Sequence, residues 1–256
     1  VEDHVIHAGH EGFGHAFHTI NDVHNGLQGK GSGQTQTTVK YDGSPAIVFG
    51  KHPENGKFFV SSKSAFNKNP KINHTHEDIA KNHGHAPGLM KKLSAALDHA
   101  HKIEPNGIYQ ADIMHSGDVK HDKKNNRVDF TPNTITYHAP ADSDHGKAAK
   151  SSKLGLAIHT EYEGKNIASL KAKHGAIDNS TFKKHKDVHL MSANHNTDTH
   201  RYSLEDRKQV DHHLEQAVAH FKNTPKEHHD TVEKHAVAKK TYINHTVRTG
   251  EAYSHE

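Results

Sequence analysis

The chain has 256 residues, of which 33 are basic and 30 acidic, and its formal charge of +3 is lower than that of a dedicated nucleic-acid scaffold. It contains no cysteine, which excludes disulfides, thiolate zinc sites and thiol nucleophiles. It also has no run of 18 apolar residues and no signal-peptide pattern, so we expect no membrane contact and no secretion.

Regular apolar patterns predict the secondary structure of the first two thirds of the chain. A helix is predicted over 11–25 and a flexible connector over 26–33. The apolar residues that set this helical spacing are Phe13, Phe17, Ile20 and Leu27. Runs of β-branched and apolar residues predict strands at 36–41, 45–51, 57–63, 107–114, 127–129, 133–138 and 153–161. Further helices are expected at 76–83 and 87–103, a turn at 123–126 and a polar loop at 139–152.

The composition changes after about residue 165, and a helical hairpin is predicted over 200–250. Ser203, with Asp206 three residues later, is a relative of the helix capping box. The second helix is expected to begin at Pro225 and to end at Gly250. The apolar faces of the two helices comprise Val210, Leu214, Val218 and Phe221, and then Val232, Ala236, Ile243 and Val247. Such stripes are typical of core packing.

Histidine is unusually frequent, with 31 residues. Full protonation would raise the formal charge from +3 to +34, so the chain becomes strongly cationic as the pH falls from about 7 to about 5. The histidines follow no recurring ligand module, and no HExxH motif occurs because His10-Glu11 is followed by His15. We interpret most of them as solvated surface residues, with a metal-binding or pH-responsive protein as the alternative.

The segment 39–50 carries the most informative pattern. Lys40 ends a β-branched run, Asp42 and Gly43 form a turn, and a second apolar strand follows. A lysine held at a strand end beside a tight turn can be partly desolvated. A nucleophilic amine requires this, because an ordinary lysine with a pKa of about 10.4 is protonated at neutral pH.

This arrangement resembles motif I of the covalent nucleotidyltransferases, the superfamily of ATP-dependent DNA ligases, RNA ligases and mRNA capping enzymes. Residues 58–64 are similar to the Ser-Lys strand segment that follows motif I in phage RNA ligases. Residues 63–68, 82–88 and 130–137 are similar to uncharacterised ligase-like proteins of tailed phages, and the resemblance covers about residues 10–165. It implies an α+β fold in which mostly antiparallel sheets form the nucleotidyltransferase core, with a helical C-terminal region.

In this superfamily the motif I lysine attacks the α-phosphate of a nucleoside triphosphate and carries the nucleotide as a phosphoramidate. The resemblance therefore implies that Lys40 is the nucleophile and that Asp42 and Gly43 lie in the ATP site. Lys63 would neutralise phosphate charge and lower the pKa of Lys40 by like-charge repulsion. The alternative is that Lys40 and Lys63 are solvated strand lysines without a role in catalysis.

Two further residues are implied by the same resemblance. Asp112 lies in a segment, 108–113, that is similar to ligase motif III, where the family carries a glutamate. An acidic residue within an apolar strand needs a partner or a function, so Asp112 is an expected Mg²⁺ ligand. His159 lies nearest the position of the aromatic residue that stacks on the base, and we expect it to contact the nucleotide.

Motifs IV and V of the family are incomplete. Glu163-Gly164 followed by Lys171 and Lys173 has the required residue types, and Glu163 is the second expected metal ligand, but the apolar strand after it is missing. Pro45 also stands where DNA ligases carry an arginine that contacts the nucleotide.

Two hypotheses follow. The first is an ATP-dependent polynucleotide ligase-like nucleotidyltransferase that uses Mg²⁺, forms a lysyl-AMP intermediate and seals DNA or RNA ends. The second is a catalytically inactive or truncated ligase-like core that serves as a phage virion or nucleic-acid-binding protein. Both place the protein in the cytoplasm of an infected bacterium or in a virion. Both divide the chain into a core over 1–190 and a helical region over 191–256.

Overall fold

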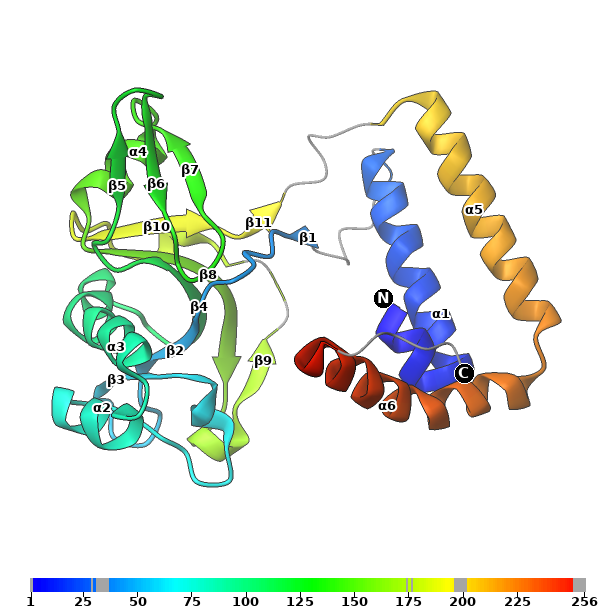
Figure 1. The fold of residues 1–256 in the computed structure, drawn as a ribbon, viewed down its shortest axis with the longest axis horizontal. Coiled ribbons are helices and arrows are strands. Elements are labelled where there is room, and N and C mark those ends of the chain that lie inside the picture. The colour runs from blue at the N-terminus through cyan, green and yellow to red at the C-terminus, as the bar shows by residue number, and fades with distance from the viewer. Residues whose placement is uncertain are drawn as a thin grey trace. The chain divides into compact units, whose positions relative to one another are not determined.

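The computed structural model describes residues 2–28, 30, 37–173, 175, 177–195 and 202–250. The chain has a mixed α+β fold and divides into two compact units (Figure 1). The helical unit comprises 1–37 and 196–256, and the sheet unit comprises 38–195. The sequence predicted a division into 1–190 and 191–256, which places the first helix in the same part as the sheet. In the structure the first helix belongs to the helical unit instead. That helix packs against the two C-terminal helices and therefore groups with them.

Three helices build the part of the helical unit that the structure describes. They are α1 (Glu2–Leu27), α5 (Leu204–Asn223) and α6 (Lys226–Thr249). The predicted end signals are present, since Ser203 and Asp206 form a capping box at the start of α5 and Gly250 ends α6 with φ of 72°. α1 is longer than the predicted helix and is kinked at Ala8 and Gly9. The connector expected over 26–33 lies partly outside the described residues.

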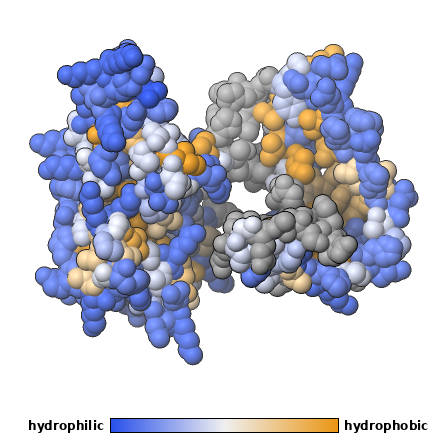
Figure 2. Space-filling model, in the orientation of Figure 1, coloured by the Kyte–Doolittle hydropathy of each residue, from blue (hydrophilic) through white to orange (hydrophobic). Residues whose placement is uncertain are grey.

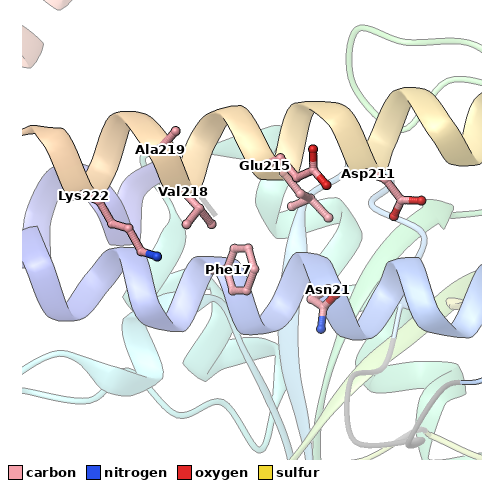
Figure 3. Close-up of a pocket in the computed structure, with 8 residues that line it drawn as sticks. Phe17, Asn21, Asp211, Glu215, Val218, Ala219 and Lys222 are labelled. Atoms are coloured by element: carbon pink, nitrogen blue, oxygen red, sulfur yellow. The ribbon is translucent and has the colours of Figure 1, made fainter.

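Aromatic and aliphatic side chains form the contact between α1 and α5. The rings of Phe13 and Phe221 stack with centroids 3.8 Å apart and 6° between their planes. Phe17 points from α1 toward α5 beside Val218 (Figure 3), and these two side chains help to line a groove of about 550 Å³. Figure 2 shows apolar side chains gathered over these helices. The apolar face predicted for α5 therefore lies against α1.

The inward face predicted for α6 is not buried. Val232 is 53% exposed and Ile243 is 38% exposed, while the side chain of Val247 lies outside the described residues. The prediction was wrong for the first two because the described residues of the helical unit form no large core. In its described part, the buried side chains are Ala16, His24 and Thr246.

A mainly antiparallel sheet of six strands forms the centre of the sheet unit, in the order β10-β8-β4-β2-β3, with β9 paired to β8. The strands are β2 (Ala46–Lys51), β3 (Phe58–Ser61), β4 (Ile108–His115), β8 (Leu154–Glu163), β9 (Lys171–Lys173) and β10 (Val188–Ser192). Only the β8–β10 pair among these strands is parallel. β4 is central and bonds to β2 on one side and β8 on the other.

Helices cover one face of this sheet. α2 (His76–His83) and α3 (Pro87–His99), followed by the 3₁₀ turn η2 (Ala100–Ile103), pack on the strands. The cluster includes Phe49, Ile113 and Leu156 from the strands and Ile79 and Leu93 from the helices. α2 has the predicted bounds because Thr75 and Asp78 form a capping box at its start.

The opposite face carries two smaller clusters. At one end, Met114 and Ala157 pack against a three-stranded sheet and a short helix. These elements are β5 (Lys120–Asp122), β6 (Arg127–Phe130), β7 (Tyr137–Pro140) and α4 (Asp144–Ser151). At the other end, Val48 and Ile108 pack against residues of the 3₁₀ turns η1 (Lys63–Phe66) and η3 (Ile167–Ser169). The expected site residue Asp112 lies on this face, between the two clusters.

Several predicted boundaries differ from the observed ones. The strand expected at 36–41 is reduced to β1 (Thr37–Thr38), which pairs with β11 (Asn194–His195). The strand expected at 133–138 begins only at Tyr137, as β7. The polar loop expected at 139–152 is wrong, because it contains α4, whose start is capped by the Ser143 side chain accepting from the amide of Gly146. A further 3₁₀ turn, η4 (Asn179–Thr181), precedes β10.

Within the described ranges, no helix is long and apolar enough to cross a membrane. The viewed face of the sheet unit is covered mostly by hydrophilic side chains (Figure 2).

Candidate functional site

The turn that carries Lys40 is tied to two neighbouring elements. The Tyr137 hydroxyl, on β7, donates to the carbonyl oxygen of Asp42 at 2.8 Å. The Tyr41 hydroxyl donates to the carbonyl oxygen of Ser192, on β10, at 3.1 Å. Gly43 has φ of 75°, a left-handed conformation that favours glycine at this turn. The sequence pattern therefore produces the predicted turn, and two tyrosine hydroxyls hold it in place.

Asp112 lies in the middle of β4, between Ala46 of β2 and Ala157 of β8. Its side chain is 17% exposed. Among the described residues, no hydrogen bond reaches its carboxylate, and the titratable side chain that lies against it is His159. Burial raises the pKa of Asp112, against the lowering effects of His159, Lys40 and Lys63 in that order. A desolvated carboxylate without a hydrogen bond is costly and is suited to receiving a ligand.

A β-bulge directs His159 toward this carboxylate. Gln110 pairs with Thr160 and Ala111 pairs with Ile158, so His159 is the extra residue of β8 without a partner on β4. Its Nε2 lies 3.9 Å from Oδ1 of Asp112, and its Nδ1 lies 2.8 Å from the Thr160 hydroxyl. Burial lowers the pKa of His159, partly opposed by the negative charge of Asp112.

Two lysines complete the charged group on this face. Lys40 precedes β2 and Lys63 begins η1, and the charges of both stabilise the ionised carboxylate of Asp112. Lys63 also acts on His159, whose pKa it lowers. Three of the residues singled out from the sequence, Lys40, Lys63 and His159, therefore each interact electrostatically with a fourth, Asp112.

The side chain of Lys40 is more exposed than expected. It is 83% exposed and forms an ion pair with Asp42, which is itself 62% exposed. The expectation of a partly desolvated amine was therefore wrong for this structure, because the side chain leaves the strand end toward solvent. The third residue expected in this segment, Gly43, has no side chain, and its role is to form the turn that orients Lys40 and Asp42.

Glu163 does not join the group. It is exposed at the end of β8, where it pairs with Lys171 of β9. It lies six residues beyond Ala157, the partner of Asp112, which at about 3.3 Å per strand residue is about 20 Å. Lys173, the other lysine of the proposed motif V, donates to Glu161 at 3.2 Å. The expected second metal ligand therefore lies away from Asp112.

No group of three or more histidine, aspartate or glutamate side chains with metal-binding geometry occurs in the described part of the chain. A cation at Asp112 would therefore have at most two ligands from the protein.

The sequence profile of one protein family matches residues 1–256. The chain belongs to DUF6267, a family of unknown function. Neither a curated protein nor a solved structure matches it. The family description names no activity, so the geometry of this DUF6267 member carries the functional argument.

Sequence reasoning did not single out two aromatic residues of this DUF6267 chain that border the site. Tyr41 and Tyr137 meet edge to face, with ring centroids 5.8 Å apart. Burial raises the pKa of each; Tyr137 and then the negative charge of Asp112 raise that of Tyr41 further, and Asp112 also raises that of Tyr137. Both lie in segments that carry the ligase resemblance, and this position in the sequence could have indicated that they border the site.

Charge is distributed unevenly between the two units of this DUF6267 chain. The sheet unit carries 23 basic and 16 acidic side chains, a formal charge of +7. The helical unit carries 10 basic and 14 acidic side chains, a formal charge of −4. The unit that holds the candidate site is therefore clearly basic, although the whole chain is nearly balanced.

Proposed function

We propose that the sheet unit is a ligase-like nucleotidyltransferase core that transfers AMP from ATP through Lys40 to nucleic-acid ends. The observation that carries the proposal is the electrostatic convergence of Lys40, Lys63 and His159 on Asp112. These residues come from four separate segments of the chain, and the resemblance had assigned all four to one site.

The reaction needs an amine nucleophile and compensation of phosphate charge. After losing a proton to solvent, the Lys40 amine attacks the α-phosphorus of ATP. A P–N bond forms while the bond from the α-phosphorus to the bridging oxygen breaks, and pyrophosphate leaves. AMP then passes to a 5′-phosphate, from which a 3′-hydroxyl displaces it. Lys63 offsets the negative charge of the phosphates.

A divalent cation such as Mg²⁺ would supply further charge compensation for the pyrophosphate. Asp112 fits such an ion, because its carboxylate is desolvated and makes no hydrogen bond within the described ranges. The formal charge of +7 on the sheet unit supports a nucleic-acid partner, since phosphate backbones are bound mainly through lysine and arginine.

A second candidate function is a catalytically inactive core that binds nucleotide or nucleic acid. Two observations favour it. Lys40 is exposed and paired with Asp42, and Glu163 lies too far along β8 to share a cation with Asp112. In this case the positive net charge of the sheet unit would be retained and the chemistry lost.

Covalent labelling separates the two. The protein is incubated with α-labelled ATP and a divalent cation, denatured, and treated with acid. We expect an acid-labile adduct in the unaltered protein and in Lys57→Ala, which removes an exposed lysine of the turn before β3, and no adduct in Lys40→Ala. Absence of an adduct from folded protein with ATP or GTP, and with Mg²⁺ or Mn²⁺, would reject the enzyme. Binding of a fluorescent oligonucleotide under those conditions would then support the second function.

A further inference from the structure

We infer that His159 and Asp112 together form a two-ligand site for a divalent transition-metal ion that arrives bound to the nucleotide, with Mn²⁺ preferred over Mg²⁺. The inference rests on the proposed function and changes the role expected for His159 from contact with the base to coordination of the cation.

The separation of the two groups suits a shared ion. Nε2 of His159 and Oδ1 of Asp112 are 3.9 Å apart, which is too long for a hydrogen bond. Two ligands that each lie about 2.1 Å from one ion are about 3.0 Å apart at an octahedral angle and about 3.4 Å apart at a tetrahedral angle. The two atoms can therefore share an ion once they approach by about 0.5–0.9 Å, which needs a small rotation of the side chains and no movement of either strand.

The orientation of the imidazole points the same way. Nδ1 of His159 lies 2.8 Å from the Thr160 hydroxyl, so an Nδ1–H group can donate to that oxygen. Nε2 then presents its lone pair toward the Asp112 carboxylate, and two acceptors face each other. Metal-binding histidines commonly have this arrangement, in which a hydrogen bond from the other ring nitrogen fixes the tautomer.

The protein alone offers too few ligands to hold the ion. The described residues contain no group of three or more metal-binding side chains, and the positive charges of Lys40 and Lys63 act at the same place. A free cation would be repelled, whereas a cation carried by a triphosphate brings its own oxygen ligands and negative charge. Cation binding should therefore depend on the nucleotide.

The imidazole determines which ion is preferred. Magnesium favours carboxylate, phosphate and water oxygens, whereas a nitrogen ligand increases affinity along the series from manganese to copper. A site with one carboxylate and one imidazole therefore favours Mn²⁺, or Co²⁺, over Mg²⁺. A pair of carboxylates, as expected from the sequence with Glu163, would not produce this preference.

The test uses Mn²⁺ and α,β-methylene-ATP, a nucleotide that cannot release pyrophosphate, with the full chain. Binding is followed by electron paramagnetic resonance, and pulsed measurements detect ¹⁴N coupled to Mn²⁺. We expect weak Mn²⁺ binding without the nucleotide. With the nucleotide we expect ¹⁴N coupling and an affinity at least about tenfold higher for the Mn²⁺ complex than for the Mg²⁺ complex.

His159→Gln should abolish the ¹⁴N coupling and lower the affinity for the Mn²⁺ complex more than the affinity for the Mg²⁺ complex, so that the Mn²⁺ preference is lost. His121→Gln, which alters an exposed histidine of β5, should retain both and controls for adventitious binding by the many other histidines. Equal affinities for the two complexes, or coupling that survives in His159→Gln, would overturn the inference and leave the proposed function standing. Absence of nucleotide binding with either cation would reject both.

Discussion

His115 and His189 lie on either side of Gly155, on three neighbouring strands, and their ring centroids are 6.0 Å apart. Both side chains are buried, with 1% and 5% of their surface exposed. In the described structure neither ring nitrogen of His115 has a hydrogen-bond partner, and His189 reaches only His145, at 3.0 Å. The missing side chain of Gly155 provides the space for the ring of His115.

Acid should destabilise the sheet unit through these two histidines. Burial lowers the pKa of each to about 4, with Asp118 opposing the effect at His115 and the neighbouring histidines adding to it at His189. These values lie below the pKa of about 6.5 that histidine has in the unfolded chain. Between about pH 4 and pH 6.5 the unfolded chain therefore binds more protons than the folded protein. The free energy of unfolding should be highest above about pH 6.5. It should decrease progressively toward pH 4, by at most about 3 kcal/mol for each histidine.

Urea unfolding at pH 7.5 and pH 5 checks this expectation. His115→Leu should reduce the difference in unfolding free energy between the two pH values, whereas His121→Gln, at an exposed position, should not change it. An unaltered pH dependence in His115→Leu would show that other groups control acid stability.

Gly155→Ala should destabilise the protein. An added Cβ would lie 2.3 Å from Cδ2 and 2.4 Å from Nε2 of His115, a buried ring that cannot move aside easily. We expect a loss of about 1–3 kcal/mol in the free energy of unfolding. Gly88→Ala is the matched control, because an added Cβ there meets no atom within 4 Å and the residue lies in α3. That change should be neutral or slightly stabilising. Equal effects of the two substitutions would contradict the packing argument.

Tyr137→Phe should weaken the support of the turn that carries Lys40. The substitution removes the hydrogen bond to the carbonyl oxygen of Asp42 and leaves the aromatic contact with Tyr41 in place. We expect a loss of about 1 kcal/mol in stability and a slower formation of the AMP adduct, measured with labelled ATP in a single turnover. An adduct rate equal to that of the unaltered protein would show that the hydroxyl does not position Lys40.

Phe221→Ala should destabilise the helical unit selectively. Phe221 of α5 stacks directly on Phe13 of α1, and the described part of this unit has few buried side chains to compensate. We expect a loss of about 2 kcal/mol, less than for a fully buried phenylalanine. Hydrogen exchange followed by mass spectrometry should show faster exchange in α1 and α5. Faster exchange in β4 of the sheet unit as well would contradict a selective effect on the helical unit.

Elements with local end signals could be predicted from the sequence. α2 has its predicted bounds because Thr75 and Asp78 cap it, and β2 begins within one residue of its predicted start because the turn at Asp42 and Gly43 precedes it. The helix α4 was missed because its composition is polar, and only the cap at Ser143 indicated it. Local signals therefore located elements better than composition did.

The arrangement of the site depended on contacts between distant residues. That Asp112 lies in a buried strand was predictable from its apolar neighbours. The bulge that directs His159 toward it was not, because the bulge depends on the register between β4 and β8. The exposed position of Lys40 and the remote position of Glu163 are likewise consequences of where the strands end.

β4 carries Asp112 near its middle and His115 at its end, and it is bonded to a strand on each side. Amides in such a strand become accessible to solvent only when the whole sheet opens. The geometry around Asp112 therefore cannot be lost by fraying of one edge while the rest of the sheet survives. Thermal loss of ligand binding and thermal loss of the sheet should coincide in one cooperative transition.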